Sequence, residues 1–408
     1  MNSKHTNPFN AVVVVASLGY FVDIYDLILF NVVKKSSLTA LGVAENLIDQ
    51  EGVMLFNLQM FGMLVGGLLW GILGDRRGRV KVLFGSILLY SAANIANAFV
   101  TDLTTYGAVR FLAGIGLAGE LGAGITLVSE NMSKEKRGLG TMILVTFGAL
   151  GAVFAFVVSE FPGLTWQHSY MIGGGMGLLL LLIRMGTLES GMFKSMHHST
   201  VKKGDFLSLF TSRERFFKYL NCILIGLPVW YVIGLLIALC VTFAKATGVT
   251  GEVSTGKAVM FAYIGLSVGD LISGLLSQFM KSRKKVVYIY LTLCAVLSAT
   301  FLFVTGLSTS AFYTLCLLLG VGTGFWALFV SIASEQFGTN IRSTVTTTVP
   351  NFVRGSVWPI TIGFQYLSPA VGVIAAASVV GVICIGLAFV ATLSVKETFG
   401  KELDYVEG

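Results

Sequence analysis

The chain has 408 residues, of which 55% are hydrophobic and only 12% are charged, and its mean hydropathy is +0.81. A soluble domain carries about twice that share of charge, so the composition excludes a soluble globular protein and indicates an integral membrane protein. The net charge of +7 would suit a nucleic-acid partner, but the placement of the charges argues against one.

Apolar runs long enough to cross a bilayer follow one another along the whole chain. A span needs roughly 20 predominantly apolar residues, and we predict twelve spans. In chain order they cover residues 10–33, 52–74, 80–100, 104–129, 139–161, 168–187, 217–243, 255–280, 285–304, 310–333, 344–367 and 370–394. The first run contains Asp23 and Asp26 and lacks a small-residue cleavage site, so we predict a retained span rather than a signal peptide.

Most basic residues lie in the connections between these spans. With a cytoplasmic N-terminus the even-numbered connections are cytoplasmic, and they hold nearly all lysines and arginines. The opposite side holds only Lys34, Lys35, Lys245 and Lys257. The positive-inside rule therefore places both termini in the cytoplasm and predicts a multi-pass protein of the inner (cytoplasmic) membrane, with the bilayer as its surroundings and no nucleic-acid partner.

The longest polar stretch divides the spans six and six. We predict an N-terminal six-helix bundle in residues 1–188, a cytoplasmic central loop in residues 189–215, and a C-terminal six-helix bundle with a short cytoplasmic tail in residues 216–408.

A repeat supports this division. Glu130 and Arg137 recur 205 residues later as Glu335 and Arg342. The pattern predicts a duplicated six-helix unit, which transporters use because two similar bundles can rock about a site held between them.

The turn between the second and third spans carries a specific motif. Residues 71–79 read Gly-Ile-Leu-Gly-Asp-Arg-Arg-Gly-Arg, in which glycines permit a tight turn and close helix contact. The segment resembles the major facilitator signature G-x-L-x-D-R-x-G-R. The matching positions are Gly71, Leu73, Asp75, Arg76, Gly78 and Arg79. In that family the signature latches the two halves in the outward-facing state, so the resemblance implies a conformational gate and the all-α major facilitator fold, with two pseudo-symmetric bundles around a central cavity.

The first and fourth spans indicate which groups of the family the chain resembles most. Residues 19–26 read Gly-Tyr-Phe-Val-Asp-Ile-Tyr-Asp, similar to the first span of metabolite:proton symporters and also to that of phosphate:proton symporters, in the branch that includes sugar porters. Residues 116–122, Gly-Leu-Ala-Gly-Glu-Leu-Gly, are closer to the G-G-E-W-G of the metabolite group. Metabolite:proton symporters import carboxylates and zwitterions, and the resemblance implies such a substrate.

Charges inside the spans need an explanation, because each costs about 2.5–3.5 kcal/mol at a helix centre. Asp23 and Asp26 share one helix face, and Arg110 in the fourth span lies at a similar depth. In the resembled fold spans one and four line the cavity, so we expect Asp26 and Arg110 to meet. Two neighbouring carboxylates in a poorly solvated cavity resist ionising together, which suits a proton carrier. Arg110 would neutralise a carboxylate or bind an anionic substrate, and a static ion pair is the alternative.

Three more charges lie within spans. Glu120 in the fourth span is either a further proton site or a carboxylic acid bonded to helix backbone. Asp270 and Arg354 lie near the centres of spans eight and eleven. We expect a structural pair between them, with Arg354 as the second-half candidate for a substrate carboxylate.

The remaining candidates are uncharged or lie at span ends. Aromatic side chains in spans are also common as packing groups or interface anchors. The cavity candidates are Tyr25, Asn57, Gln59, Trp230, Tyr231, Trp326, Asn351 and Gln365. For a gate at the cytoplasmic ends, the candidates besides the signature are Glu130, Arg137, Glu335 and Arg342.

These patterns predict a secondary active transporter that works by alternating access, most simply proton-coupled uptake of a small organic anion or zwitterion, and as a monomer. Uptake of inorganic phosphate, export of a larger anion such as a siderophore, and a non-transporting substrate sensor are the alternatives. Residues 114–119 spell a dinucleotide fingerprint but lie inside a span, so helix packing is the better interpretation. We expect no enzyme activity, metal or cofactor.

Overall fold

The computed structural model describes residues 11–77, 79–132, 137–188, 206–338 and 340–400. Within these residues the secondary structure is helical, and ten helices are long and apolar enough to cross a membrane. The other two predicted spans are α3 (Arg79–Asn97) and the pair α14 (Arg342–Gly355) and α15 (Val357–Val371), which is broken at Ser356. The twelve-span architecture is thus confirmed.

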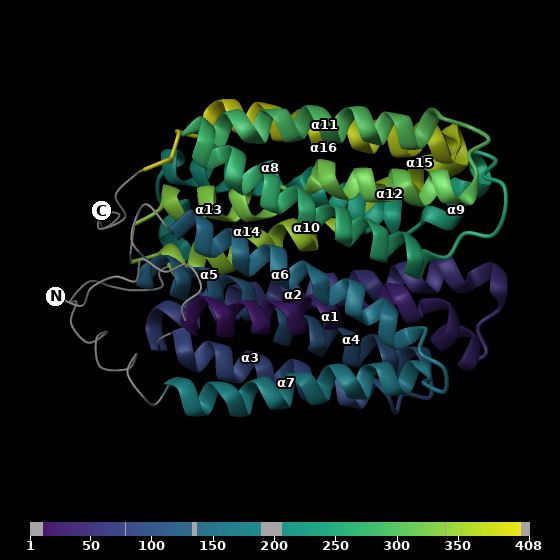
Figure 1. Cartoon of the computed structure of the whole chain (residues 1–408), viewed down its shortest axis with the longest axis horizontal. Coiled ribbons are helices and arrows are strands. Elements are labelled where there is room, and N and C mark those ends of the chain that lie inside the picture. Colours follow the sequence, from purple (N-terminus) through teal and green to yellow (C-terminus); the bar gives the residue numbers. More distant parts are fainter. Residues whose placement is uncertain (1–10, 78, 133–136, 189–205, 339, 401–408) are drawn as a thin grey trace.

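The first six spans form one group of neighbouring helices, shown in purple to teal in Figure 1. Besides α3, they are α1 (Ala11–Ala40), α2 (Ile48–Arg77), α4 (Leu103–Leu117) with α5 (Glu120–Asn131), α6 (Arg137–Ser159) and α7 (Trp166–Leu188).

The last six spans form the second group, shown in green to yellow in Figure 1. Besides α14 with α15, they are α8 (Arg213–Tyr231) with the π-helical η4 (Val232–Ile237) and α9 (Cys240–Ala246), α10 (Thr255–Met280), α11 (Arg283–Phe303), α12 (Thr309–Thr323) with α13 (Trp326–Gln336), and α16 (Val373–Ser394).

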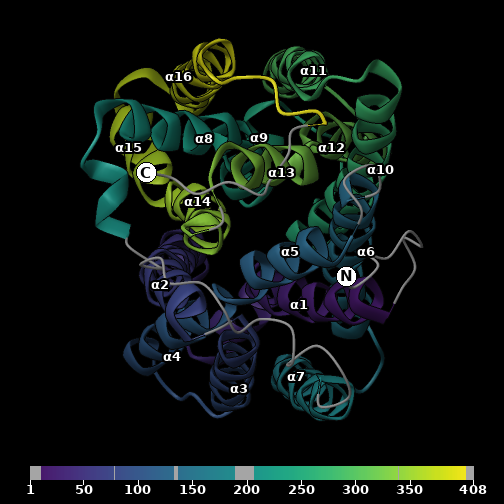
Figure 2. The ribbon, with the colours of Figure 1, turned by 90° about the vertical axis from the view of Figure 1, so that its left-hand side faces the viewer.

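The helices run along the long axis of the molecule, so the molecule has two ends (Figures 1 and 2). We call the end where α1 begins the Ala11 end, and the end where it finishes the Ala40 end. The first helix extends seven residues beyond the predicted limit at residue 33, because Lys34 pairs with Asp49 at 2.8 Å and stays part of the helix. Positive charge at this end is therefore partly neutralised inside the fold.

The fourth and tenth spans are broken at equivalent places. Span four is interrupted between α4 and α5 at Ala118–Gly119, and span ten between α12 and α13 at Gly324–Phe325. The two breaks are separated by about the repeat length seen in the sequence. Each break starts a new helix deep in the fold, and Glu120 and Trp326 stand at those new N-termini.

Glycines let the helices approach backbone to backbone. Gly114 of α4 lies against the Gln59 backbone of α2, and Gly320 of α12 lies against the Ala262 backbone of α10. The glycine run in residues 114–119 thus serves helix packing, as predicted from its place inside a span.

The two groups of helices are in close contact towards the Ala11 end. Gly122 of α5 packs on Thr347 of α14, and the Asn351 side-chain amide donates to the Ala118 carbonyl at 2.8 Å. Gly71 of α2 packs against Thr344 of the same helix α14. Small residues therefore let α14 fit tightly against α2 and α5.

We predict that Gly320→Ala destabilises the protein, because the new methyl group would overlap the α10 backbone. Overpacking of this kind costs about 1–3 kcal/mol. Thermal unfolding of the purified protein in detergent would show a lower midpoint. The matched control is Gly386→Ala in α16, where a Cβ meets nothing within 4 Å and helix propensity favours alanine. Equal midpoints for the two variants would contradict the packing role of Gly320.

Candidate substrate site and buried charges

A small pocket lies between the two groups of helices, midway along α1. The space open to the centre of a water molecule is about 20 Å³, enough for one water. Seven helical elements line it, and the residues are Tyr20, Ile24, Val145, Ala149, Val229, Trp230, Ile233, Tyr263, Leu266, Trp326 and Arg354. The site is therefore closed around its centre in this conformation.

Arg354 is the cation of this pocket and connects the two groups of helices. Its Nη2 atom lies 3.6 Å from Asp23 Oδ2 and 3.4 Å from the Tyr20 hydroxyl, both on α1. All three side chains are buried. The prediction that Asp270 pairs with Arg354 is wrong. Asp23 of α1 is the carboxylate next to the guanidinium, whereas Asp270 of α10 binds the backbone of Ala327.

Several polar atoms at the pocket have no hydrogen-bond partner among the described residues. They include Nε of Arg354, the indole Nε1 of Trp326 and both carboxylate oxygens of Asp23. Buried polar groups are normally hydrogen-bonded. The Nε–H of a loosely held arginine and the indole N–H beside it make a site suited to an anion.

Aromatic rings surround this cation. The Trp326 ring lies 5.8 Å from the Arg354 guanidinium carbon, and the Trp230 and Trp326 centroids are 6.5 Å apart in an edge-to-face arrangement. Tyr20 and Tyr263 complete the wall. Aromatic pairs prefer such geometry, so the space beside the guanidinium is walled by rings on several sides.

Asp270 has a different role from the predicted one. Its Oδ1 accepts a hydrogen bond from the Ala327 backbone N–H at 3.0 Å, at the first turn of α13. A carboxylate at this position caps the helix and satisfies a free N–H. Asp270 thereby fixes the start of α13 and, through the backbone, the position of Trp326.

The cavity candidates separate into two groups. Trp230, Trp326 and Arg354 lie together in the pocket. Tyr25 and Tyr231 point elsewhere, since their hydroxyls donate to the Ser169 carbonyl of α7 and the Ala377 carbonyl of α16.

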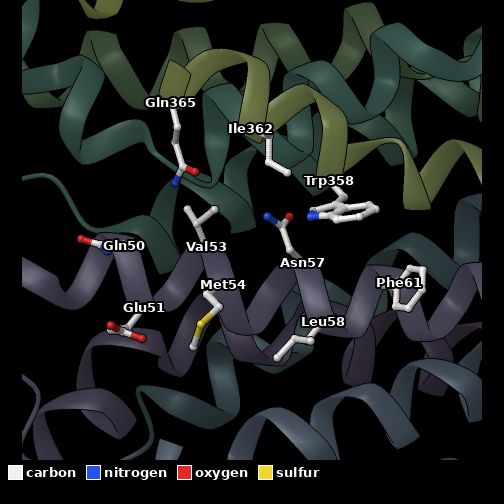
Figure 3. A pocket seen from close by; sticks show the side chains of 10 residues that line it. All are labelled: Gln50, Glu51, Val53, Met54, Asn57, Leu58, Phe61, Trp358, Ile362 and Gln365. Atoms are coloured by element: carbon white, nitrogen blue, oxygen red, sulfur yellow. The ribbon is translucent and has the colours of Figure 1, made fainter. Parts of the chain in front are cut away.

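A second, larger hollow lies between α2 and α15 towards the Ala40 end (Figure 3). Its volume for water-sized molecules is about 410 Å³. The predicted residue Gln365 lines this hollow, and Asn57 donates to Thr361 across it at 2.9 Å. The side chains of Gln365 and Asn57 approach the hollow from opposite groups of helices (Figure 3). Gln365 is thus apart from Arg354.

Asp26 and Arg110 lie near each other inside the first group of helices but form no ion pair. Arg110 Nη1 donates to the Tyr170 hydroxyl at 2.8 Å, and its guanidinium lies over the Phe30 and Tyr170 rings. Both oxygens of Asp26 lack a hydrogen-bond partner among the described residues. The expected direct pair is therefore replaced by contact of Arg110 with Tyr170, because that hydroxyl from α7 takes the guanidinium.

Glu120 forms a buried ion pair that the sequence analysis missed. Arg184 of α7 donates to both carboxylate oxygens of Glu120, at 2.5 and 2.9 Å, and to the Val15 carbonyl at 3.3 Å. Glu120 is thus bonded to a side chain rather than to helix backbone. Arg184 could have been found from its place four residues from the end of the sixth predicted span, within an otherwise apolar run.

The structure describes some of the residues predicted to form a gate. Glu335 binds Arg283 of α11 through two contacts of 2.6 Å, and Arg342 donates to the Ser334 and Phe337 carbonyls at 3.3 Å. Arg76 is exposed at the end of α2. The structure does not describe Gly78 or the side chains of Asp75, Arg79, Glu130 and Arg137.

Glu397, beyond α16, docks on the start of α11 next to this pair. Burial opposes its ionisation, but hydrogen bonds from Ser282 and from the Arg283, Phe399 and Lys284 backbones hold the pKa of its carboxyl below its ordinary value. The Arg283–Glu335 pair is thus framed by a second anion at the Ala11 end.

Comparisons with known proteins agree with this architecture. The sequence model of the Major Facilitator Superfamily matches residues 16–361, and the chain belongs to this superfamily of membrane transporters; it is not an enzyme. Its particular relatives are transporters of small organic metabolites. The chain is 28% identical to a putative niacin/nicotinamide transporter of Bacillus subtilis, over 86% of both chains. It is 25% identical to a gentisate transporter of Corynebacterium glutamicum, over 80% of this chain and 74% of the relative.

A solved structure supports the fold independently. The transporter FucP, in its outward conformation, superimposes with a TM-score of 0.74 at 16% identity, covering 96% of this chain and all of that one. At this identity the likeness concerns the fold alone.

We predict that the Glu120–Arg184 pair stabilises the first group of helices. Removing one partner leaves an uncompensated buried charge, which costs about 3–5 kcal/mol. Glu120→Gln and Arg184→Gln should each lower the thermal midpoint in detergent, while the double variant should recover part of the loss. Additive losses in the double variant would contradict direct pairing.

Proposed function

We propose that this protein is a proton-coupled symporter that takes up a small ring-bearing carboxylate through the pocket around Arg354. The observation that carries the proposal is the arrangement of one buried arginine, an indole N–H without a partner and aromatic walls in a single pocket between the two groups of helices.

The carboxylate end of the substrate would bind Arg354 and the Trp326 indole N–H. Arginine binds carboxylates through two parallel N–H donors, and Arg354 Nε has no partner of its own. Its contact with Asp23 at 3.6 Å is long for a hydrogen bond. A substrate carboxylate would therefore form stronger bonds than those it displaces.

The ring end would lie between Trp230, Trp326 and the tyrosines. Inorganic phosphate would need polar donors on several sides, whereas most residues lining this pocket are aromatic or aliphatic. Ligand pockets of this kind, apolar with a few placed polar groups, are typical of small organic molecules. The pocket thus favours an organic acid over phosphate.

The relatives support the same chemistry. The names of these relatives include niacin and gentisate, which each combine an aromatic ring with a carboxyl group; the first name also includes nicotinamide, in which an amide replaces the carboxyl. A ring and a carboxylate are the two features for which the pocket offers partners.

Coupling to protons would use Asp23 and Asp26. While Asp23 is ionised, its carboxylate neutralises the positive charge of the Arg354 guanidinium. A proton on Asp23 removes that anion and leaves the guanidinium to the substrate carboxylate, so one proton and one anion fill the site together. Asp26 lies one turn further along the same face of α1 and can hand a proton to Asp23.

Alternating access would open the pocket to each side in turn. The two groups of helices are packed together at the Ala11 end, where α14 contacts α2 and α5, and the hollow between α2 and α15 opens towards the Ala40 end. The charge distribution predicts that the Ala11 end lies in the cytoplasm. The hollow at the Ala40 end would then open to the outer face of the inner membrane. Separation of α14 from α2 and α5 would then release the substrate inward.

The test of the substrate site is ligand binding to the purified protein. We expect benzoate and nicotinate to raise the thermal midpoint, since a ligand of the native state stabilises it by mass action. Benzamide, inorganic phosphate and acetate should have little effect. Arg354→Gln should weaken benzoate binding at least about tenfold, roughly 1.4 kcal/mol, while Arg213→Gln at the exposed start of α8 serves as the control. Stabilisation by phosphate alone would overturn the proposal.

A second test concerns coupling. We predict that Asp23→Asn, which imitates the protonated acid, binds benzoate with little dependence on pH and exchanges it across proteoliposome membranes. The same variant, and Asp26→Asn, should fail to accumulate benzoate when a pH gradient is imposed. Undiminished gradient-driven accumulation in both variants would show that these aspartates do not carry the coupled proton.

A further inference from the structure

Inside the first group of helices, a chain of hydrogen-bonded hydroxyls runs from the Ala40 end towards Asp26. The Tyr106 hydroxyl lies 3.4 Å from Ser37 Oγ and 2.7 Å from the Tyr170 hydroxyl, and Arg110 donates to Tyr170 at 2.8 Å. The side chains of these four residues are fully buried. The chain is continuous over three helices, α1, α4 and α7.

The outer end of this chain lies near the molecular surface. Ser37 belongs to the last turn of α1, Tyr106 to the first turn of α4, and Tyr170 to the second turn of α7. Thr104 and Thr105, next to Tyr106, are exposed. Water at the Ala40 end is thus within about one helical turn of the first hydroxyl.

The inner end lies at Asp26. Gly173 of α7 lies against Asp26 Oδ1, and Tyr170 is three residues earlier on the same face of α7. Tyr170 and Asp26 also interact electrostatically. Among the described residues, the titratable groups that interact with Asp26 are Asp23 and Tyr25 on its own helix, Tyr90 of α3, Arg110 of α4 and Tyr170 of α7.

The polar atoms beside this inner end are unusually short of partners. Both Asp26 oxygens and Nε and Nη2 of Arg110 have no hydrogen-bond partner among the described residues. The same holds on α3 for Ser91 Oγ and the side-chain atoms of Asn94 and Asn97, of which Asn94 interacts with Asp26. Ser91, Asn94 and Asn97 follow one another at three-residue spacing and so share a face of α3. Such a group of buried polar atoms suits water bridges, which would close any gap between Tyr170 and Asp26.

We propose that Ser37, Tyr106 and Tyr170 form a proton relay that loads Asp26 from the Ala40 end, by a route inside the first group of helices and separate from the route of the substrate. This inference rests on the proposed proton coupling and identifies its entry path. The substrate pocket lies between the two groups of helices, whereas α4 and α7 lie on the far side of α1 and α2 from the second group (Figure 2).

Hydroxyls suit this task because each is both a donor and an acceptor. In this structure Tyr106 donates to Ser37, and Ser37 donates to the Lys34 carbonyl, so inward transfer begins when the Ser37 hydroxyl turns towards Tyr106. Tyr170 then gives its proton to the Asp26 carboxylate and takes one from Tyr106, which takes one from Ser37, which takes one from water. The net result is one proton moved from water to Asp26, with every hydroxyl restored and rotated. Arg110 keeps its own protons, and its charge stabilises a transient negative charge on the Tyr170 oxygen.

The experiment compares Tyr106→Phe and Tyr170→Phe, which remove one hydroxyl each and keep the ring. In proteoliposomes with radiolabelled benzoate, we expect accumulation driven by a pH gradient to slow at least about tenfold. Counterflow of benzoate, which needs no net proton movement, should stay within about twofold of the unaltered protein in the same vesicles. The matched control is Tyr219→Phe, which removes a hydroxyl bonded to Thr348 at 2.8 Å in the second group of helices.

A second measurement does not depend on the substrate. After a pH jump, infrared spectroscopy can follow the carboxyl band that Asp26→Asn removes, and this band should respond more slowly in Tyr106→Phe. Unaltered accumulation and band kinetics in both tyrosine variants would overturn the relay, as would a parallel loss of counterflow. Absence of benzoate counterflow in the unaltered protein would instead count against the proposed substrate, with the infrared result still deciding the relay.

Discussion

The cost of holding charge inside a membrane governs the arrangement of this protein. Asp23, Asp26, Arg110, Glu120, Arg184, Asp270 and Arg354 all lie within spans and are buried. Glu120 and Arg184 satisfy each other through short contacts, and one oxygen of Asp270 accepts a hydrogen bond from the backbone of α13. Asp23 and Arg354 are held loosely, at 3.6 Å, across the boundary between the two groups of helices. A weak pair at a moving interface can be exchanged for another partner, whereas the tight pairs cannot be exchanged cheaply.

The two halves of the structure use related breaks for different purposes. In the fourth span the break places Glu120 at the start of α5, where Arg184 ties it to α7 and α1. In the tenth span the break places Trp326 at the start of α13, where Asp270 caps the helix. The first break therefore stiffens one group of helices, while the second presents an indole N–H to the pocket. Of the two related helix starts, one thus holds an ion pair and the other lies at the proposed substrate pocket.

Separate routes for proton and substrate would have a mechanical advantage. The hydroxyl chain lies among α1, α4 and α7, which remain together within one group of helices, so rocking of one group against the other need not break it. The pocket around Arg354 lies between the groups and changes shape when they move. Among the helices that the structure describes, only α1 carries residues of both, with Asp26 at the proposed relay and Asp23 at Arg354. Movement of a proton between these neighbours on one helix would connect the two routes.

The sequence by itself determined the class of fold. Hydropathy, the 205-residue repeat and the signature at residues 71–79 can be read along the chain without knowing which residues are in contact. The twelve spans and the superfamily could therefore be predicted. It also identified Asp23, Asp26, Glu120 and Arg354 as exceptional, because a charge in an apolar run is visible without a structure.

Only the tertiary structure decided which of these charges meet. Depth along a helix can be counted, but the rotation of each helix about its axis depends on packing against its neighbours. For this reason Arg354 was expected beside Asp270 yet lies beside Asp23, and Arg110 was expected beside Asp26 yet binds Tyr170. Arg184 was missed as the partner of Glu120 because their 64-residue separation is bridged by the packing of α5 and α7 against α1. Partners across helices follow from close packing of the whole bundle, which no single segment of the sequence encodes.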